Sequence, residues 1–368
     1  MRQKVRAAVV ESPSRMVMRE FDMPEIGPED GLLKVEMVGV CGTDPKLYSG
    51  KVKYVDFPLI LGHETLGRIF RIGDTASKRW RVREGDRVIV EHFIPCGECP
   101  RCLTGDYRFC RSLRAYGQFV SCSVPPFLWG GYSEYMYLAP KSIVYKISED
   151  VPAEAGILIT GVVSNAIRWG RRVGDFGIGD AVVIQGAGQQ GLCQVIVARE
   201  SGCSPIIVTG LSADTRGFQL ARELGADYTI DVEKEDVVKR VKEITRGHMA
   251  DVVVDVAGSV KAIQTSVDLV KNGGTIVVAT LTGSETVTPL IADKIVLREI
   301  RFQGVFSSDA REMGRAIRLV ESRKYPIEKI VSHRYSLEEA EKAVRTAGGY
   351  FKDLRPTKCV IVPSFSIS

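Results

Sequence analysis

The chain of 368 residues lacks any continuous apolar stretch of the roughly 18 residues that a membrane-spanning helix needs. It also lacks a dense Lys/Arg run, and 50 basic residues against 45 acidic ones leave a net charge of only +5. There is no internal repeat, and the amino-terminal residues carry neither the apolar core nor the cleavage site of a signal peptide. These absences disfavour a membrane or nucleic-acid partner, and we expect a cytoplasmic protein.

The residues that are present, 45% hydrophobic and 26% charged, are typical of a globular protein. At roughly 150 residues per domain, the length predicts two domains. Short apolar strands fill the first 150 residues, whereas from residue 180 Val/Ile-rich strands alternate with helices, which indicates a parallel sheet covered on both faces. We therefore expect an α/β protein with a discontinuous β-rich domain (1–155 and 305–368) around an inserted doubly wound domain (156–304).

A glycine fingerprint follows the first strand of the alternating series. Residues 181–185 lead directly into Gly186, Gly188 and Gly191 in the spacing G-x-G-x-x-G, and a helix follows. This context distinguishes a dinucleotide-binding turn from a plain strand-to-helix turn. The first glycine permits the tight turn, the second admits a pyrophosphate and the third lets helix and strand pack closely.

The ends of the later strands supply further candidate cofactor contacts, namely Gly210, Asp214, Arg216, Val256 and Thr280. Gly210 occupies the position where an acidic residue usually binds the adenosine ribose. Asp214 could reach back to that ribose, or Arg216 could hold a 2′-phosphate. NAD and NADP both stay open, with a slight preference for NAD because no basic residue directly follows Gly210.

Four cysteines, Cys96, Cys99, Cys102 and Cys110, lie within a lobe at about residues 92–115. Thiols of a cytosolic protein are kept reduced, so a tight cluster indicates a metal. Four thiolates complete a tetrahedral zinc site with no open position, which predicts a structural zinc. The spacing matches neither common ferredoxin pattern of an iron–sulfur cluster.

A second candidate metal site combines Cys41 with His63 and Glu64, which stand about twenty residues further along. A catalytic zinc needs about three protein ligands and an open position. From the residues alone, a structural His–Glu pair is the alternative interpretation.

The order of the motifs resembles the zinc-dependent medium-chain alcohol dehydrogenase family over nearly the whole chain. The motifs are Cys41-Gly-Thr-Asp, Gly62-His63-Glu64-x2-Gly67-x5-Gly73, Gly85-Asp86-Arg-Val, the four cysteines, Gly130-Gly-Tyr-Ser-Glu134-Tyr and the glycine fingerprint. The resemblance implies a GroES-like catalytic domain, an inserted Rossmann domain, an active site between them and a homodimer or homotetramer.

The resemblance also implies roles for individual residues. Cys41 and His63 match catalytic zinc ligands, Glu64 matches a carboxylate that binds the metal in some members, and Thr43 matches the hydroxyl that takes the substrate proton. Lys46 stands where a histidine often ends the proton relay. Thr160 and Gly161 occupy the place of a further ligand and offer none. Glu64 could complete the site, water could replace the ligand, or zinc could bind weakly; we favour Glu64.

The expected activity is reversible hydride transfer from a small alcohol, secondary, cyclic or polyol, to NAD(P), giving a ketone or aldehyde (EC 1.1.1.-). Two zinc ions per chain are expected, one catalytic and one structural. One alternative is a zinc-independent, NADPH-dependent enone reductase of the same fold, against which the Cys41–His63 pair argues. The other is a non-catalytic dinucleotide-binding scaffold.

Overall fold

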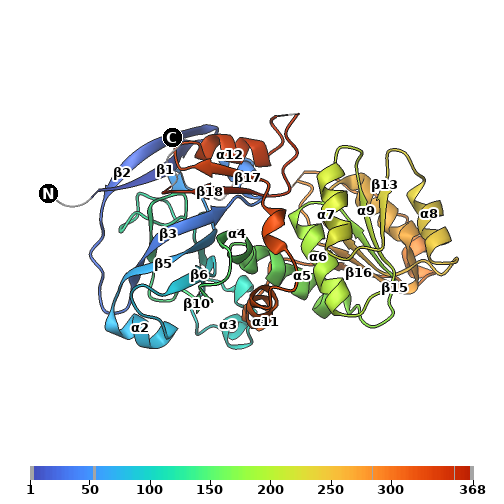
Figure 1. Ribbon diagram of the computed structural model, residues 1–368, viewed down its shortest axis with the longest axis horizontal. Coiled ribbons are helices and arrows are strands. Elements are labelled where there is room, and N and C mark those ends of the chain that lie inside the picture. The colour runs from blue at the N-terminus through green and yellow to red at the C-terminus, as the bar shows by residue number, and fades with distance from the viewer. Residues whose placement is uncertain (1–3, 53–54, 284, 352, 365–368) are drawn as a thin grey trace. The chain divides into compact units, whose positions relative to one another are not determined.

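Figure 1 shows the computed structural model of the chain, which describes residues 4–52, 55–283, 285–351 and 353–364. The chain divides into two compact units, Met1–Thr160 with Asp309–Ser368, and Gly161–Ser308. These borders fall a few residues after the ones expected from the sequence. Among the described residues, no helix has the length and apolarity to cross a membrane.

The first unit is built mainly from strands. Its strands are β1 (Lys4–Ser12), β2 (Arg15–Asp22), β3 (Gly31–Gly39), β4 (Leu59–Ile60), β5 (Glu64–Ile72), β6 (Arg87–Val90), β7 (Phe93–Ile94), β8 (Arg114–Ala115), β9 (Tyr135–Leu138), β10 (Val144–Lys146), β17 (His333–Ser336) and β18 (Cys359–Val362). Its helices are α1 (Asp44–Tyr48), α2 (Asp74–Trp80), α3 (Pro100–Leu103), η1 (Tyr107–Phe109), α4 (Ala153–Gly156), α11 (Ala310–Glu321), η4 (Ile327–Ile330) and α12 (Ala340–Ala347). The π-helix η2 (Ile159–Val163) spans the border between the units.

The main sheet of this unit joins the two ends of the chain. Its strand order is β10-β6-β5-β3-β18-β17, and β9 also pairs with β3. Strand β18 pairs antiparallel with β3 through Val360 opposite Gly39, so a strand of the second segment completes the sheet of the first (Figure 1). One buried apolar cluster runs from Val5 to Ile361, which explains why the two segments form one unit.

The second unit is a doubly wound α/β domain. Its strands are β11 (Val182–Gln185), β12 (Ile206–Gly210), β13 (Tyr228–Asp231), β14 (Ala250–Asp255), β15 (Val270–Val278) and β16 (Arg301–Gly304). Its helices are α5 (Ser164–Ala166), η3 (Ile167–Gly174), α6 (Gln189–Glu200), α7 (Thr215–Glu223), α8 (Val237–Ile244), α9 (Val260–Leu269) and α10 (Ala292–Val296).

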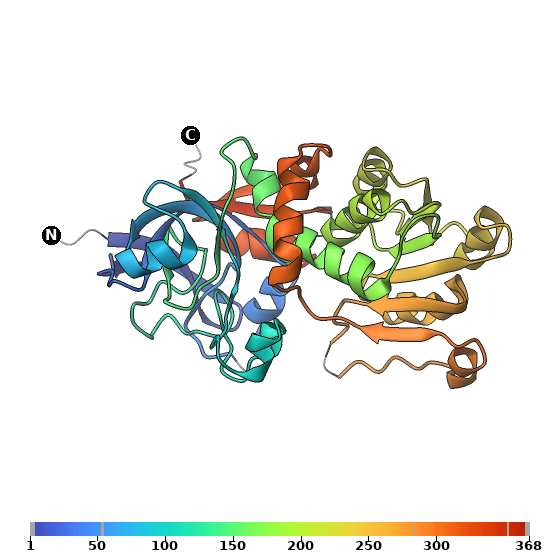
Figure 2. The same cartoon turned by 90° about the horizontal axis from the view of Figure 1, so that it is seen from below.

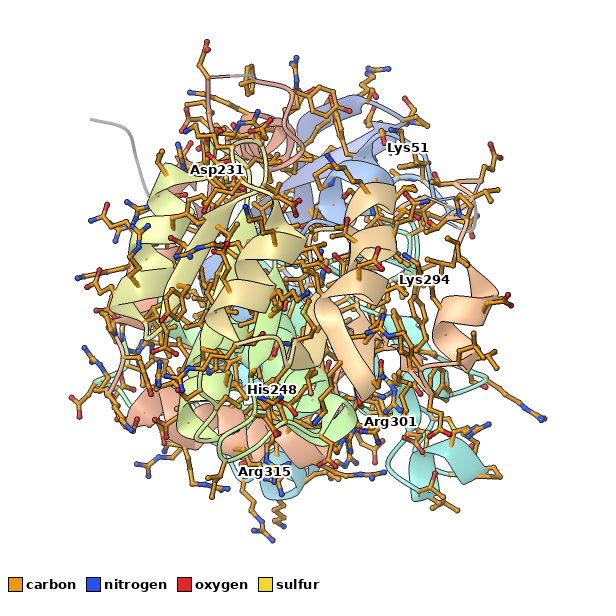
Figure 3. All side chains as sticks on the ribbon, turned by 90° about the vertical axis from the view of Figure 1, so that its right-hand side faces the viewer. Lys51, Asp231, His248, Lys294, Arg301 and Arg315 are labelled. Atoms are coloured by element: carbon orange, nitrogen blue, oxygen red, sulfur yellow. The ribbon has the colours of Figure 1, made fainter. Side chains whose placement is uncertain are left out.

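The six strands are parallel in the order β13-β12-β11-β14-β15-β16, and Figure 2 shows the orange β16 at one edge. Helix α6 packs against both η3 and α7, and α8 packs against α9. The apolar strands predicted such a sheet, and the Rossmann architecture is confirmed. Asp231 and His248 lie at opposite ends of this unit in Figure 3, because Asp231 ends β13 whereas His248 precedes β14.

Asp255 is a buried carboxyl group at the carboxyl end of β14. Burial raises the pKa of Asp255 from its ordinary 3.8 to about 6, although the Thr280 hydroxyl and the Ala257 N–H donate hydrogen bonds to the carboxylate and oppose the shift. The folded chain therefore holds this proton more tightly than the unfolded chain does.

We predict that Asp255→Asn changes how stability depends on pH. In the wild type, raising the pH from about 4 to about 6 deprotonates a buried carboxyl and lowers the free energy of unfolding, by up to roughly 3 kcal/mol at 1.4 kcal/mol per pKa unit. Asparagine has no such titration, so the stability of the variant relative to wild type should rise across this window.

Thermal midpoints of the cofactor-free proteins at pH 4, 5, 6 and 7 measure this difference. Asp268→Asn on α9 is the matched control, since its exposed carboxylate pairs with Lys294 at the surface. A constant difference between the Asp255 variant and wild type over the whole range would contradict the prediction.

Candidate functional site

The first candidate site lies where β3 ends and β5 begins. The two strands are antiparallel with Gly39 opposite Glu64, so Cys41, just past β3, lies near His63, just before β5. One donor atom from each of Cys41, His63 and Glu64 lies within 4.8 Å of the other two. A thiolate, an imidazole and a carboxylate at this spacing are donors that suit zinc.

A buried carboxylate, that of Asp44, holds this group from behind. Asp44 Oδ2 accepts hydrogen bonds from the Cys41 N–H (2.8 Å) and the Tyr132 hydroxyl (2.9 Å). Its Oδ1 lies 3.3 Å from His63 Nδ1. The contact with Nδ1 fixes the orientation of the His63 ring and leaves Nε2 as the nitrogen for an ion.

The electrostatics of His63 reflect this anionic surrounding. Burial disfavours the charged imidazolium, but the negative charges of Asp44 and Cys41 outweigh burial and raise the pKa of His63 well above its ordinary value. The pocket thus stabilises positive charge, as a site that binds a cation must.

Glu64 is the third donor of the group, and its carboxylate pairs with the buried ammonium of Lys358. No donor comes from the place where the family has a further ligand. The Thr160 hydroxyl is buried and has no hydrogen-bond partner among the described residues. The carbonyl of Gly161 accepts hydrogen bonds from Asn165 and Gln190 instead.

Thr43 and Lys46 lie on the same turn as Cys41. Cys41 Sγ is 3.7 Å from Thr43 Oγ1, and Thr43 is the N-cap of α1, which carries Lys46. Burial lowers the pKa of Lys46, and the nearby Lys51 lowers it further, while Cys41 opposes the shift. A lysine of lowered pKa can exchange protons more readily near neutral pH.

The four predicted cysteines of the lobe also converge. The sulfur atoms of Cys96 and Cys99 lie 3.8 Å and 3.5 Å from that of Cys102. A disulfide would need about 2.05 Å, whereas four thiolates around zinc at about 2.3 Å stand about 3.8 Å apart. Donor atoms of all four residues lie within 4.8 Å of one another, so the set fits a tetrahedral ion.

Backbone N–H groups in the lobe favour thiolates. A hydrogen bond from the Cys102 N–H is the main reason that the pKa of Cys99 falls to about 6, and the N–H of Glu98 lowers the pKa of Cys96. Burial raises the pKa of Cys102 to about 12, which a bound cation would reverse. The lobe is held to the unit by buried Arg108, whose guanidinium donates to Asp309 at 2.8 Å.

The second candidate site is the glycine turn after β11. Gly186 has φ +114°, a conformation that favours glycine, and a Cβ on Gly191 would overlap the carbonyl of Gly186. A Cβ on Gly188 would meet nothing within 4 Å, so the space beside it is open. Gly188 is the N-cap of the 12-residue helix α6, whose first N–H groups can bind phosphate oxygens.

The other predicted cofactor residues lie at the same edge of the sheet. Val256 donates its N–H to the Gln185 carbonyl at 2.9 Å, beside the glycine turn, and the Thr280 hydroxyl donates to Asp255. Asp214 reaches back toward Gly210, since its Oδ2 accepts the Leu211 N–H at 2.9 Å. Arg216 lies exposed in the first turn of α7.

Two residues of the first site were missed by sequence analysis. Asp44 stood in the quoted motif, and its position three residues after Cys41 was a signal that could have indicated a partner for the histidine. Lys358 offered no signal, because it lies nearly 300 residues away from Glu64 in the chain. Only the pairing of β18 with β3 reveals it.

The two units and their sites define a class: a GroES-like unit with two clusters of residues that could hold a metal ion, joined to a Rossmann unit with a dinucleotide-type glycine turn. Family comparisons agree, since residues 27–149 match the alcohol dehydrogenase GroES-like domain and residues 191–322 match the zinc-binding dehydrogenase domain.

Relatives extend the similarity to full length. The chain is 38% identical to "Probable alcohol dehydrogenase adh" of Mycobacterium tuberculosis over 364 residues, 98% of each chain. It is 32% identical to sorbitol dehydrogenase of Rattus norvegicus over 346 residues, which cover 92% of this chain and 91% of that protein.

Solved structures show the same fold. An alcohol dehydrogenase of Thermotoga maritima has a TM-score of 0.89 and 28% identity, covering 98% of this chain and 100% of that one. A Sinorhizobium meliloti 1021 protein bound to NADP has a TM-score of 0.86 and 28% identity with the same coverage. The chain belongs to the zinc-dependent medium-chain alcohol dehydrogenase family, and it is an NAD(P)-dependent alcohol dehydrogenase.

We predict that Asp44→Asn weakens metal binding at the first site by roughly 10- to 100-fold, the usual effect of losing the carboxylate behind a metal-binding histidine. The substitution keeps the size of the side chain but removes the charge that faces His63. The rate at which a chromogenic chelator extracts zinc from the folded protein measures the effect.

The cysteine lobe provides an internal control, because its zinc should be extracted at the wild-type rate. Asp268→Asn is a matched second control, since its exposed carboxylate lies on α9, outside both candidate metal-binding groups. Equal extraction rates at the first site in wild type and Asp44→Asn would show that Asp44 does not support the metal.

Proposed function

We propose that this chain is a zinc-dependent dehydrogenase that oxidises a secondary, cyclic or polyol alcohol to a ketone or aldehyde, with NAD as hydride acceptor and two zinc ions per chain. The observation that carries the proposal is the convergence of donor atoms from Cys41, His63 and Glu64 within 4.8 Å. Four convergent thiolates account for the second ion.

Cys41, His63 and Glu64 would hold a zinc ion, which would supply Lewis acidity to the alcohol oxygen, and a bound nicotinamide would supply the hydride acceptor. The protein contributes alignment and proton transfer. The Thr43 hydroxyl, beside Cys41, takes the proton of the substrate hydroxyl, and Lys46 passes it outward with the help of its lowered pKa. Asp44 holds the His63 ring through Nδ1 and leaves Nε2 as the nitrogen that would bind a cation.

The substrate class is supported by the similar proteins. They include sorbitol dehydrogenases, an erythritol/L-threitol dehydrogenase of Mycolicibacterium smegmatis and a D-arabitol-phosphate dehydrogenase of Enterococcus avium. Two of these names give a polyol as the substrate, and the third gives a polyol phosphate. We therefore place polyols first among the candidate alcohols.

An oligomer, a homodimer or homotetramer, is part of the proposal. Within the described residues, β16 pairs only with β15, so its outer edge is open. Exposed apolar side chains lie on this strand and on the segment before it: Val287, Ile291, Val296, Leu297 and Phe302. An open edge with apolar neighbours favours association with a second copy.

A spectrophotometric screen tests the proposed reaction. Purified protein is mixed with polyols (sorbitol, erythritol, arabitol) or with secondary and cyclic alcohols, and formation of NADH or NADPH is followed. We expect reduction of NAD with at least one polyol. Cys41→Ser should lower the zinc content from about two to about one per chain and reduce activity by roughly 100-fold or more.

Cys122→Ser is the matched control, because Cys122 is buried outside both metal-binding groups. If no alcohol reduces either cofactor, and Cys41→Ser leaves the zinc content unchanged, the proposed reaction is wrong.

The preference for NAD is supported by what surrounds Gly210. A Cβ on Gly210 would lie 2.9 Å from Asp214 Oδ2 and 3.0 Å from the Phe218 ring, so the Asp214 carboxylate lies directly beside this position. A carboxylate here can accept hydrogen bonds from ribose hydroxyls and repels a 2′-phosphate. Asp214 thus stands in for the acidic residue that Gly210 lacks.

Two further carboxylates lie next to this turn. Ser212 donates its hydroxyl to Asp231 at 2.7 Å and its N–H to Glu233 at 2.8 Å, and Lys234 neutralises part of this charge through Asp231. The hydrogen bond from Ser212 is the main cause that lowers the pKa of Asp231, so this group is anionic at neutral pH. The local charge disfavours NADP, the cofactor with which the Sinorhizobium meliloti protein was solved.

We predict that the wild type binds 5′-AMP more tightly than 2′,5′-ADP, and that Asp214→Asn reduces this preference by roughly tenfold, about 1.4 kcal/mol. Asparagine keeps an oxygen for the Leu211 N–H but removes the charge. Isothermal titration calorimetry with the two nucleotides measures both affinities without catalysis.

Arg216→Ala is the informative companion variant. It should leave the ratio of the two affinities unchanged if Asp214 sets the preference. If instead the wild type prefers 2′,5′-ADP and Arg216→Ala abolishes that preference, Arg216 holds a 2′-phosphate and the chain uses NADP.

A further inference from the structure

A fully buried lysine, Lys358, lies directly before β18, the last strand of the chain. Its ammonium donates one hydrogen bond to Oε2 of Glu64 and another to the Val40 carbonyl at 3.1 Å. Burying an ammonium group is costly unless it is paired and hydrogen-bonded. The Glu64 carboxylate therefore stabilises the buried charge of Lys358, and Lys358 in turn stabilises the buried charge of Glu64.

The strand register explains how two such distant residues meet. In the main sheet, β3 lies between β18 and β5, with Gly39 opposite Val360 on one side and opposite Glu64 on the other. A Cβ on Gly39 would overlap the Glu64 carboxylate and lie 2.9 Å from Lys358 Cε. The ion pair thus crosses β3 over a residue that has no side chain.

The two oxygens of the Glu64 carboxylate have different surroundings. Oε2 is bound by Lys358, whereas Oε1 is buried and has no hydrogen-bond partner among the described residues. An orphaned buried oxygen on an ionised carboxylate is costly unless a cation completes it. Because Glu64 belongs to the group with Cys41 and His63, a metal ion bound by these three residues would supply that cation.

The charges of the buried group agree with this assignment. Asp44, Glu64 and a Cys41 thiolate carry three negative charges, and Lys358 carries one positive charge. A divalent cation would bring the group to neutrality with His63 uncharged. Without the lysine, the same group with its metal would hold an unbalanced negative charge in a buried place.

We infer that Lys358 is a positioning residue for the metal site: it holds Glu64 through Oε2 so that Oε1 serves as the third protein ligand, in place of the ligand that Thr160 and Gly161 do not provide. The inference rests on the proposed function, which supplies the metal. The opposite possibility is that Lys358 draws Glu64 away from the ion and water takes the place. A Glu64 carboxylate oxygen lies within 4.8 Å of the Cys41 and His63 donors, and Oε1 is the oxygen that Lys358 leaves without a partner, which together favour the first.

The test compares Lys358→Met with Lys358→Arg, which keeps the charge. Each protein is purified with zinc, and the zinc content and the rate of zinc release to a chelator are measured. We expect Lys358→Met to release the zinc of the first site roughly 10- to 100-fold faster, and Lys358→Arg to restore most of the retention. Lys342→Met, on exposed Lys342 of α12, is the matched control and should behave as wild type.

Cobalt substitution supplies a spectroscopic readout at the same site. The visible absorption of bound Co²⁺ depends on its ligands, so Lys358→Met and Glu64→Gln should shift the wild-type spectrum in the same way. A Lys358→Met protein whose spectrum and zinc release equal those of wild type would overturn the inference.

The double variant Glu64→Gln/Lys358→Met separates positioning from a general structural role, and it removes both members of the buried pair if the single variant folds poorly. If Lys358 acts through Glu64, the double variant releases zinc no faster than Glu64→Gln alone. If the two effects multiply, Lys358 acts elsewhere and the inference is wrong. A wild type that holds only the zinc of the cysteine lobe would instead refute the proposed function itself.

Discussion

The buried carboxylate of Asp44 is the contact on which the candidate active centre depends. It accepts hydrogen bonds from the Cys41 backbone and the Tyr132 hydroxyl, and it faces the His63 ring. Three segments that are separate in the sequence are therefore held around one negative charge. Because a buried charge is stable only when its surroundings are fixed, the position of the thiol and the orientation of the imidazole follow from the same requirement.

The same requirement explains why the catalytic unit uses both ends of the chain. The second segment contributes Lys358, which pairs with Glu64 of the first site, and Asp309, which accepts a hydrogen bond from Arg108 of the cysteine lobe. Each of these four side chains is buried and would be costly alone. Apolar packing joins the segments, while the paired charges determine their register, since a shift of β18 against β3 would separate Lys358 from Glu64.

Much of this could be predicted from local patterns. The glycine fingerprint, the four cysteines and the alternation of apolar strands with helices each depend on residues close together in the chain, where spacing translates directly into geometry. The pairing of Cys41 with His63 and Glu64 needed the resemblance to a family, because about twenty residues of unknown path separate them. Lys358 could not be predicted, since its role depends on one pairing of strands and an ordinary lysine carries no spacing signal. The π-helix at Ile159–Val163 likewise left no mark in the sequence.

Two glycines in strands, Gly39 and Gly210, each have charged side chains close to where their own side chain would lie. At Gly39 the missing side chain leaves room for Glu64 and Lys358, and at Gly210 it leaves room for the Asp214 carboxylate. At Gly39 the charged groups come from two other strand regions, whereas at Gly210 the carboxylate comes from the turn that directly follows the strand. A search for the dinucleotide-binding pattern finds Gly210 at the end of β12 and therefore reports that the usual acidic residue is absent. The structure places a charged group beside each of these glycines, so a missing acidic residue in a sequence of this fold is a reason to look for a charged neighbour.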